Sequence, residues 1–156
     1  MQASTTFLRN TRIWGEYTWT NALTFMHNIP TTTFESNQYN LGHYLEDNAK
    51  DFYLGVEYRP LRTMNIKVYY NHSLKGPDHT ALGTMPRAEI SPFEPTVWTS
   101  ARIGILATVQ IVNDLYARLG YEWRDVSGEQ DYLDRWTPEE YHGKTGTLRI
   151  GLNYGF

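Results

Sequence analysis

Histidine and acidic side chains are the residues of this chain whose types could do chemistry. There are five histidines, of which His43 precedes Asp47 by four positions and His79 stands beside Asp78. Imidazole and carboxylate groups are common metal ligands, but a metal site needs a preorganised geometry that this spacing does not define. We therefore expect solvated or ligand-facing histidines, with no metal site and no cofactor.

A second group of candidate residues lies in segment 125–141, where acids stand among aromatic rings. The CH faces of a sugar pack on such rings, and carboxylates accept hydrogen bonds from sugar hydroxyls. Two other interpretations stay open, namely Ca²⁺ or a divalent bridge to lipopolysaccharide, and a solvated loop with no ligand. The candidate ligand-binding residues are His43, Asp47, Asp131, Tyr132, Trp136 and Tyr141.

The motifs of the common enzyme classes are absent. The chain has no Gly-x-Ser-x-Gly elbow, Walker loop, dinucleotide-binding glycine pattern or His-Glu-x-x-His pair. It also has 0 Cys, which excludes disulfides, thiolate metal sites and cysteine nucleophiles. Paired acids alone do not make a glycosidase, which needs a defined carboxylate separation. We predict a protein that is not an enzyme and has no catalytic residues.

Length and charge are those of one folded domain, residues 1–156. The 14 Lys and Arg against 17 Asp and Glu give a net charge of −3, which argues against nucleic acid as a partner. No apolar run reaches the length of a membrane-spanning helix. The aromatic content, with 12 Tyr, 6 Phe and 5 Trp, suits β surfaces and the boundary between water and lipid.

Hydrophobic and polar residues alternate along six segments, which predicts strands with two unlike faces. The segments are 11–25 with a break near Asn21, 51–59, 64–71, 97–111, 115–124 and 148–156. Residues 4–9 are a candidate for a further strand. Single helical turns are expected only at 44–50 or 138–141, where Thr137-Pro138-Glu139-Glu140 has the order of a helix start.

The connections between these segments alternate strictly between long and short. Segments 27–49, 72–96 and 125–146 are long, whereas 60–63 and 112–114 are tight turns. Repeated long loops are unusual in a compact soluble meander but typical of outer-membrane barrels, whose long loops lie outside and short turns in the periplasm. The pattern predicts an antiparallel up-and-down transmembrane β-barrel. Its candidate interface aromatics are Trp14, Trp19, Tyr58, Trp98, Trp123 and Phe156.

The strand number is too small for a closed barrel in a membrane. The smallest such barrels have about eight strands, and six are expected here. An open sheet in lipid would leave its edges unpaired. We therefore expect the chain to be a portion of a larger barrel.

The last segment, Leu148-Arg149-Ile150-Gly151-Leu152-Asn153-Tyr154-Gly155-Phe156, resembles the carboxy-terminal assembly signal of Gram-negative outer-membrane proteins. In that signal a terminal aromatic residue follows apolar residues at alternate positions. The matching residues are Leu148, Ile150, Leu152, Tyr154 and Phe156. The resemblance implies recognition by the barrel-assembly machinery and a location in the Gram-negative outer membrane, among its lipid and lipopolysaccharide.

Residues 38–49, with the alternating segment 52–60, resemble part of the Bacteroidetes outer-membrane proteins of the capsule assembly Wzi type. The shared features are the pair Gly42-His43 and acidic residues that precede an alternating strand. Members of that family are large barrels that hold capsular polysaccharide at the cell surface. The resemblance implies a role in attaching or exporting surface polysaccharide, through binding and without bond chemistry.

Other functions fit the same alternation. A porin-like channel or an outer-membrane secretion or assembly component would also place the charged positions of the strands toward the interior. A soluble β-barrel with a ligand cavity would instead turn the apolar set inward and the polar set outward, and the period alone fits both arrangements.

Overall fold

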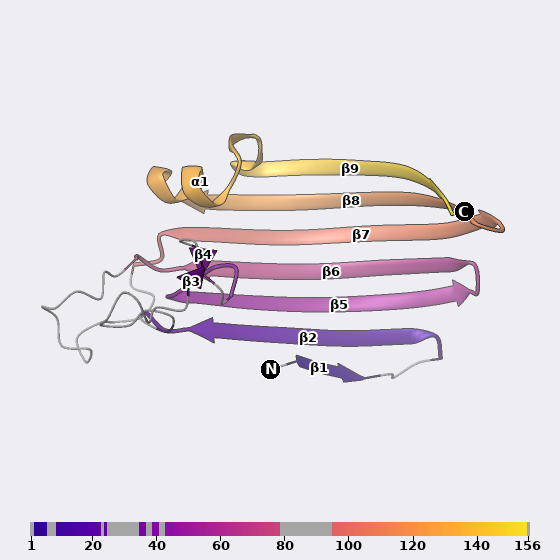
Figure 1. Ribbon diagram of the computed structural model, residues 1–156, viewed down its shortest axis with the longest axis horizontal. Coiled ribbons are helices and arrows are strands. Elements are labelled where there is room, and N and C mark those ends of the chain that lie inside the picture. Colours follow the sequence, from indigo (N-terminus) through magenta and orange to yellow (C-terminus); the bar gives the residue numbers. More distant parts are fainter. Residues whose placement is uncertain are drawn as a thin grey trace, which may run out of the picture.

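The computed structural model describes residues 2–5, 9–22, 24, 35–36, 39–40, 43–78 and 95–155, with the backbone alone at 2–5, 35–36 and 39–40. One antiparallel sheet forms most of this structure (Figure 1). Its six long strands are β2 (Thr11–Thr20), β5 (Ala49–Leu61), β6 (Met64–Lys75), β7 (Trp98–Val112), β8 (Leu115–Gly128) and β9 (Gly143–Tyr154). The prediction of an all-β fold built on these six segments is confirmed.

The strands follow one another up and down without a crossover. The order in the sheet is β1-β2-β5-β6-β7-β8-β9, where β1 (Gln2–Thr5) is a short seventh strand beside β2. Two further short strands, β3 (Glu35–Ser36) and β4 (Tyr39–Asn40), pair with each other. Within the described residues β1 and β9 form the two edges, so the sheet is open.

Tight turns lie at one end of the sheet, which we call the short-turn end. Arg62 and Thr63 join β5 to β6, and Asn113 and Asp114 join β7 to β8. Asp114 has a φ of 66°, a left-handed conformation that aspartate tolerates in turns. Close to this end the register of β5 against β6 shifts between Tyr58 and Leu61, around Pro60, because proline has no N–H to donate to the ladder.

The opposite, long-loop end carries the helical segments (Figure 1). The connection from β8 to β9 contains α1 (Gln130–Trp136) and a 3₁₀ helix over Glu139–Tyr141. The expected helical turn at 138–141 is therefore present, whereas 44–50 forms a bend that runs into β5, and α1 was not expected. No helix in the described part of the chain is long and apolar enough to cross a membrane.

The registers place every second side chain on a common face across all the long strands. Cross-strand rows such as Ile13, Val56, Val68, Ile105, Tyr121 and Leu148 form the apolar face. Rows such as Glu16, Tyr53, Asn71, Arg102, Arg124 and Thr145 form the polar face. The two faces therefore differ in chemistry along the whole sheet.

Burial on the two faces is the reverse of that in a water-soluble protein. Ile103 and Ile105 lie on β7, which has a neighbouring strand on each side, yet their exposed fractions are 48% and 47%. On the polar face Asn71, Ser73 and Glu122 have exposed fractions of 8% or less. Polar side chains thus occupy the protected side of the sheet, and apolar side chains the open side.

The interface aromatics expected from the sequence divide between the two faces. Trp19, Tyr58 and Trp123 lie on the apolar face and are exposed. Trp14 and Trp98 lie on the polar face, which corrects the expectation for these two residues. Each stands one position along its strand from residues that lie on the apolar face, so its side chain points to the opposite side of the sheet. Phe156 lies outside the described residues.

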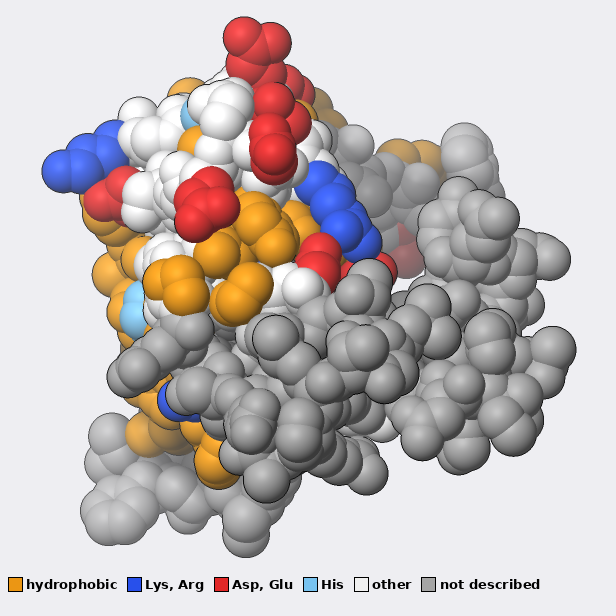
Figure 2. Space-filling view, turned by 90° about the vertical axis from the view of Figure 1, so that its left-hand side faces the viewer, with side chains coloured by type: hydrophobic (Ala, Val, Ile, Leu, Met, Phe, Trp, Pro, Cys, Tyr) orange, Lys and Arg blue, Asp and Glu red, His pale blue; other side chains and the backbone are white. Residues whose placement is uncertain are grey.

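Among the described residues, buried apolar side chains form a small cluster at the long-loop end. It consists of Leu45, Ala49, Trp98 and Val126, against which three partly buried residues of α1 pack, namely Tyr132, Leu133 and Trp136. Figure 2 looks onto this end and shows hydrophobic side chains gathered among acidic and basic ones. Segment 43–48 and α1 therefore cover part of the polar face at this end.

Candidate functional site

The candidate site is the polar face together with the segments that cover its long-loop end. In the middle of this face, large rings lie over glycines of neighbouring strands. A Cβ at Gly55 would stand 2.4 Å from the Trp14 ring, and a Cβ at Gly104 would stand 2.4 Å from the Tyr69 ring. Each glycine therefore leaves room for a ring to lie flat along the face.

A lysine joins the rings into one cluster. The Nζ of Lys67 lies 5.2 Å from the centre of the Trp14 ring and 5.7 Å from those of Tyr53 and Tyr69. The two tyrosine rings are stacked, with centres 6.0 Å apart. An ammonium group at this distance is attracted by ring faces, so the cluster combines a cation with surfaces on which a sugar ring could pack.

Glu122 is the main acidic group of the central polar face. It accepts a hydrogen bond from the Tyr69 hydroxyl and a 2.7 Å bond from the Arg124 guanidinium. The guanidinium of Arg149 lies 3.9 Å from the same carboxylate. The Arg124 guanidinium also lies 4.5 Å from the centre of the Tyr141 ring, which brings the segment after α1 onto this face.

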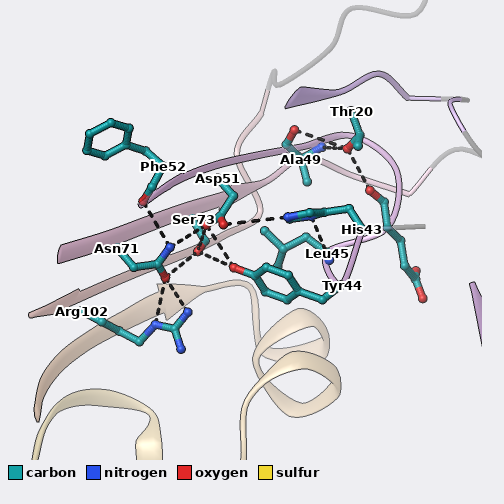
Figure 3. A network of polar contacts seen from close by, with 11 residues as sticks. Thr20, His43, Tyr44, Leu45, Ala49, Asp51, Phe52, Asn71, Ser73 and Arg102 are labelled. Carbon is teal, nitrogen blue, oxygen red and sulfur yellow. Dashed lines mark hydrogen bonds and ion pairs between the residues drawn. The ribbon is translucent and has the colours of Figure 1, made fainter. Parts of the chain in front are cut away.

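Nearer the long-loop end, a second network is centred on Asp51 (Figure 3). One carboxylate oxygen of Asp51 accepts hydrogen bonds from the Ser73 hydroxyl at 2.7 Å, the Asn71 amide at 2.8 Å and the Tyr44 hydroxyl at 3.0 Å. The Arg102 Nε donates to the Asn71 amide oxygen at 3.0 Å. Three strands and the segment before β5 are joined by these contacts.

His43 and Tyr44 are the titratable groups of this network outside the strands. Burial lowers the pKa of His43 below its ordinary value of 6.5, against the raising effects of Asp51 and Glu16. The His43 Nε2 lies 3.8 Å from the Asp51 carboxylate. Burial also raises the pKa of the Tyr44 hydroxyl. The neutral forms of both groups are therefore favoured in the folded protein.

The bend before β5 is fixed by its own hydrogen bonds. Asn48 is buried at a φ of 54°, and its side-chain amide donates to the Pro77 carbonyl at 2.8 Å. The Thr20 hydroxyl donates to the Glu46 carbonyl at 2.8 Å and accepts from the Ala49 N–H at 3.0 Å. The covering segment is thus held against β2 and against the end of β6.

Lys75 is a buried cation beneath this cover, with only 1% of its surface exposed. Its Nζ donates to the Asp47 carbonyl at 2.5 Å, pairs with Asp78 at 3.1 Å and lies 5.4 Å from the centre of the Trp136 ring. The Arg135 guanidinium also pairs with Asp78, at 2.7 Å. Since the ammonium is surrounded by protein groups, we assign it a role in holding α1 and not in binding ligand.

The six ligand-binding candidates from the sequence separate into different environments. Asp47, Tyr132 and Trp136 meet around Lys75 and Asp78, where the Tyr132 hydroxyl accepts a 3.0 Å bond from the Asp78 N–H. His43 belongs to the Asp51 network, as shown in Figure 3. Tyr141 packs on Arg124, and Asp131 is exposed in the first turn of α1.

Four of the five assembly-signal residues lie on the edge strand β9, and the fifth, Phe156, lies outside the described residues. Leu148, Ile150, Leu152 and Tyr154 all lie on the apolar face, with exposed fractions of 62% to 77%. His27 and His79 lie outside the described residues. Among the described residues no three His, Cys, Asp or Glu side chains are close enough together to hold a metal ion.

The polar face can therefore bind through hydrogen bonds, charge and ring stacking. From the sequence, the charged residues of this face were expected only as interior positions of a barrel, and Trp14 only as an interface aromatic. The placement of a glycine opposite a large ring depends on the register of two strands, so no sequence signal located the cluster. No family model, no curated protein and no solved structure matches this chain.

Proposed function

We propose that this chain forms part of the wall of an outer-membrane β-barrel in a Gram-negative cell, with a non-enzymatic role in attaching or exporting surface polysaccharide. The reversed burial of the two faces is the observation that carries the proposal. In lipid an exposed apolar face is favourable, whereas in water it is not.

The apolar face has the chemistry that a lipid environment favours. Aliphatic residues predominate in its middle rows, among them Val56, Ile105 and Leu119, with Tyr70 and Tyr121 between them. Trp19 and Trp123 lie toward the long-loop end, and Tyr58 and Tyr154 toward the short-turn end. Aromatic residues on either side of an aliphatic band are typical of membrane barrels, where they lie at the two interfaces with water.

Strand length and connection pattern add further support. The six long strands have 10 to 15 residues, and about 9–11 tilted residues suffice to cross the hydrocarbon layer. Tight turns at one end and long connections at the other match the asymmetry of outer-membrane barrels. A soluble barrel with a ligand cavity would bury its apolar face, so the burial favours the membrane proposal over that alternative.

The role in polysaccharide binding rests on the polar face and on the resemblances described above. Rings beside a lysine, and acids beside arginines, offer stacking surfaces and hydrogen-bonding groups for a polar chain. Lipid, lipopolysaccharide and the barrel-assembly machinery are the further partners that this location implies. A porin-like channel remains the second candidate, favoured by the mixed charges of the polar face.

Fractionation of cells that express the intact protein tests the membrane location. We expect recovery in the outer membrane, resistance to extraction until detergent is added, and a change in electrophoretic mobility on heating. Recovery as a soluble monomer would contradict the proposal.

Two substitutions at adjacent positions of β7 test whether the apolar face, and not the polar face, contacts lipid. Ile105→Glu places a carboxylate on the apolar face and should reduce the amount of folded protein in the membrane, at a cost of about 1–2 kcal/mol. Leu106→Glu is the matched control, because it faces Lys67 on the polar face. Equal membrane levels of the two variants would count against a lipid-facing apolar surface.

A further inference from the structure

A cavity at the short-turn end of the polar face is lined by three arginines. It has a volume of about 420 Å³ and is bounded by Arg59, Arg62 and Arg118, with Asn65, Gln110 and Tyr116 between them. Arg62 is in the turn after β5, Arg59 is near the end of β5, and Arg118 is on β8. The fold therefore gathers cations from separate segments around one cavity.

Most of this positive charge is not neutralised by the protein. Arg59 pairs with Glu57 at 2.7 Å, but within the described residues neither the Arg62 nor the Arg118 side chain has a hydrogen bond or an ion pair. Glu57 is itself held by the Asn65 side-chain amide at 2.8 Å. Two guanidinium groups are thus left with free donors at the cavity.

A second cavity continues the basic surface. It has a volume of about 330 Å³. It shares Arg59 with the first cavity and is otherwise lined by Asn10, Thr11, Arg12 and Glu57. The two cavities together present four arginines against a single glutamate. Guanidinium groups bind carboxylates and phosphates through paired donors, so this surface suits an anionic ligand.

The polar residues of the cavity indicate more than a bare anion. Thr108 and Gln110 offer a hydroxyl and an amide at the cavity wall, which can exchange hydrogen bonds with the several hydroxyls of a sugar. Tyr116 adds a ring and a hydroxyl at the same wall.

We propose that this cavity binds an acidic saccharide, with the sugar's carboxylate or phosphate on Arg62 and Arg118 and its hydroxyls on the neighbouring polar side chains. The inference rests on the proposed function, since it names the class of polysaccharide that the polar face receives. The Lys67 ring cluster and Arg149 lie on the same face and continue the cationic surface toward the middle of the sheet.

Calorimetric titration of the intact, detergent-solubilised protein tests this proposal. The probes are tetragalacturonate as the acidic saccharide, maltotetraose as the neutral one, and inorganic phosphate as the bare anion. We expect binding of tetragalacturonate, much weaker binding of the other two, and weakening of the Kd between about 0.05 and 0.5 M salt. Equal binding of maltotetraose would overturn the anionic part of the proposal, and equal binding of phosphate the saccharide part.

Single arginine substitutions locate the site. Arg62→Gln and Arg118→Gln should each raise the Kd for tetragalacturonate about tenfold. Lys144→Gln removes one positive charge from an exposed position at the start of β9, at the long-loop end, and should leave the Kd within about twofold. Unchanged Kd values in both arginine variants would overturn the proposal. Retained heat-modifiable mobility shows that each variant is folded.

The two proposals fail in different ways. A soluble protein that binds tetragalacturonate through Arg62 and Arg118 would keep this site and lose the membrane location. An outer-membrane protein that does not bind the acidic tetramer would keep the location and lose this site.

Discussion

The hydroxyl of Tyr69 on β6 passes over Gly104 on β7 and donates a hydrogen bond to Glu122 on β8. The three residues stand in one cross-strand row of the polar face. Because the glycine has no side chain, a tyrosine can reach a carboxylate two strands away. This contact ties three strands together on the side of the sheet that carries the charges.

Filling the space at Gly104 should break this contact. In Gly104→Ala the new Cβ would stand 2.4 Å from the Tyr69 ring, so the ring must move away from Glu122. We expect a loss of about 1–3 kcal/mol in the free energy of unfolding, measured by denaturant titration in detergent. Gly151→Ala is the control, since its Cβ would meet the Arg118 Cβ at an ordinary 3.9 Å. Equal unfolding midpoints for the two variants would refute this explanation.

Asp51 should hold the segment before β5 against the sheet. Asp51→Ala removes the acceptor shared by Tyr44, Asn71 and Ser73, so each of these side chains loses one of its hydrogen bonds and the segment before β5 loses its link to the Asp51 carboxylate. Amide exchange at Glu46 should then be at least about tenfold faster, since its N–H bonds only to the nearby His43 carbonyl. Glu57→Ala, toward the other end of the same strand, should leave this amide unchanged.

Acid should loosen the same segment through His43. Its pKa in the folded protein lies below the ordinary 6.5, so the unfolded state takes up a proton first as the pH falls. The contribution of His43 to the free energy of unfolding is therefore fully present above pH 6.5 and is lost as the pH falls below this value. An NMR titration should place the His43 midpoint below 6.5, and His43→Asn should reduce the fall in unfolding free energy between pH 7.5 and about pH 5. A midpoint above 6.5 would show that Asp51 outweighs burial.

Lys75 should determine how firmly α1 is attached. Lys75→Met keeps most of the side-chain volume but removes the ammonium contacts to the Asp47 carbonyl, Asp78 and the Trp136 ring. We expect α1 to be cleaved faster in limited proteolysis, with a stability loss of about 1–3 kcal/mol. Lys144→Met, at an exposed lysine, should be cleaved at the rate of the unchanged protein. Equal rates for the two variants would mean that apolar packing alone holds the helix.

Alternation predicted the strands because the direction of a side chain in a strand depends only on whether its position is odd or even. The strand ends were less predictable. β6 continues to Lys75 and β8 to Gly128, beyond the expected ends at 71 and 124. Polar residues there have weak strand preference, and pairing with β7 keeps them extended. α1 is only seven residues long, too short to display a helical period.

The site was less accessible to sequence reasoning than the fold. Asp51 lies directly opposite Ser73, but this neighbourhood depends on the register of two strands and not on distance along the chain. Lys75 would ordinarily be assigned to the surface, and it is buried because α1 and segment 43–48 close over it. Chemistry that depends on register and on covering segments becomes visible only in three dimensions.

A sheet with an exposed apolar face is not stabilised by burying that face against other parts of the same chain. Isoleucines such as Ile103 and Ile105 gain hydrophobic free energy only from the medium or the neighbour that covers them. In plain water the ladder hydrogen bonds and the cluster around Trp98 are the main internal sources of stability. The stability of this fold therefore depends on the solvent at its apolar face. Moving the chain between water and detergent should change the free energy of unfolding more than most single substitutions can.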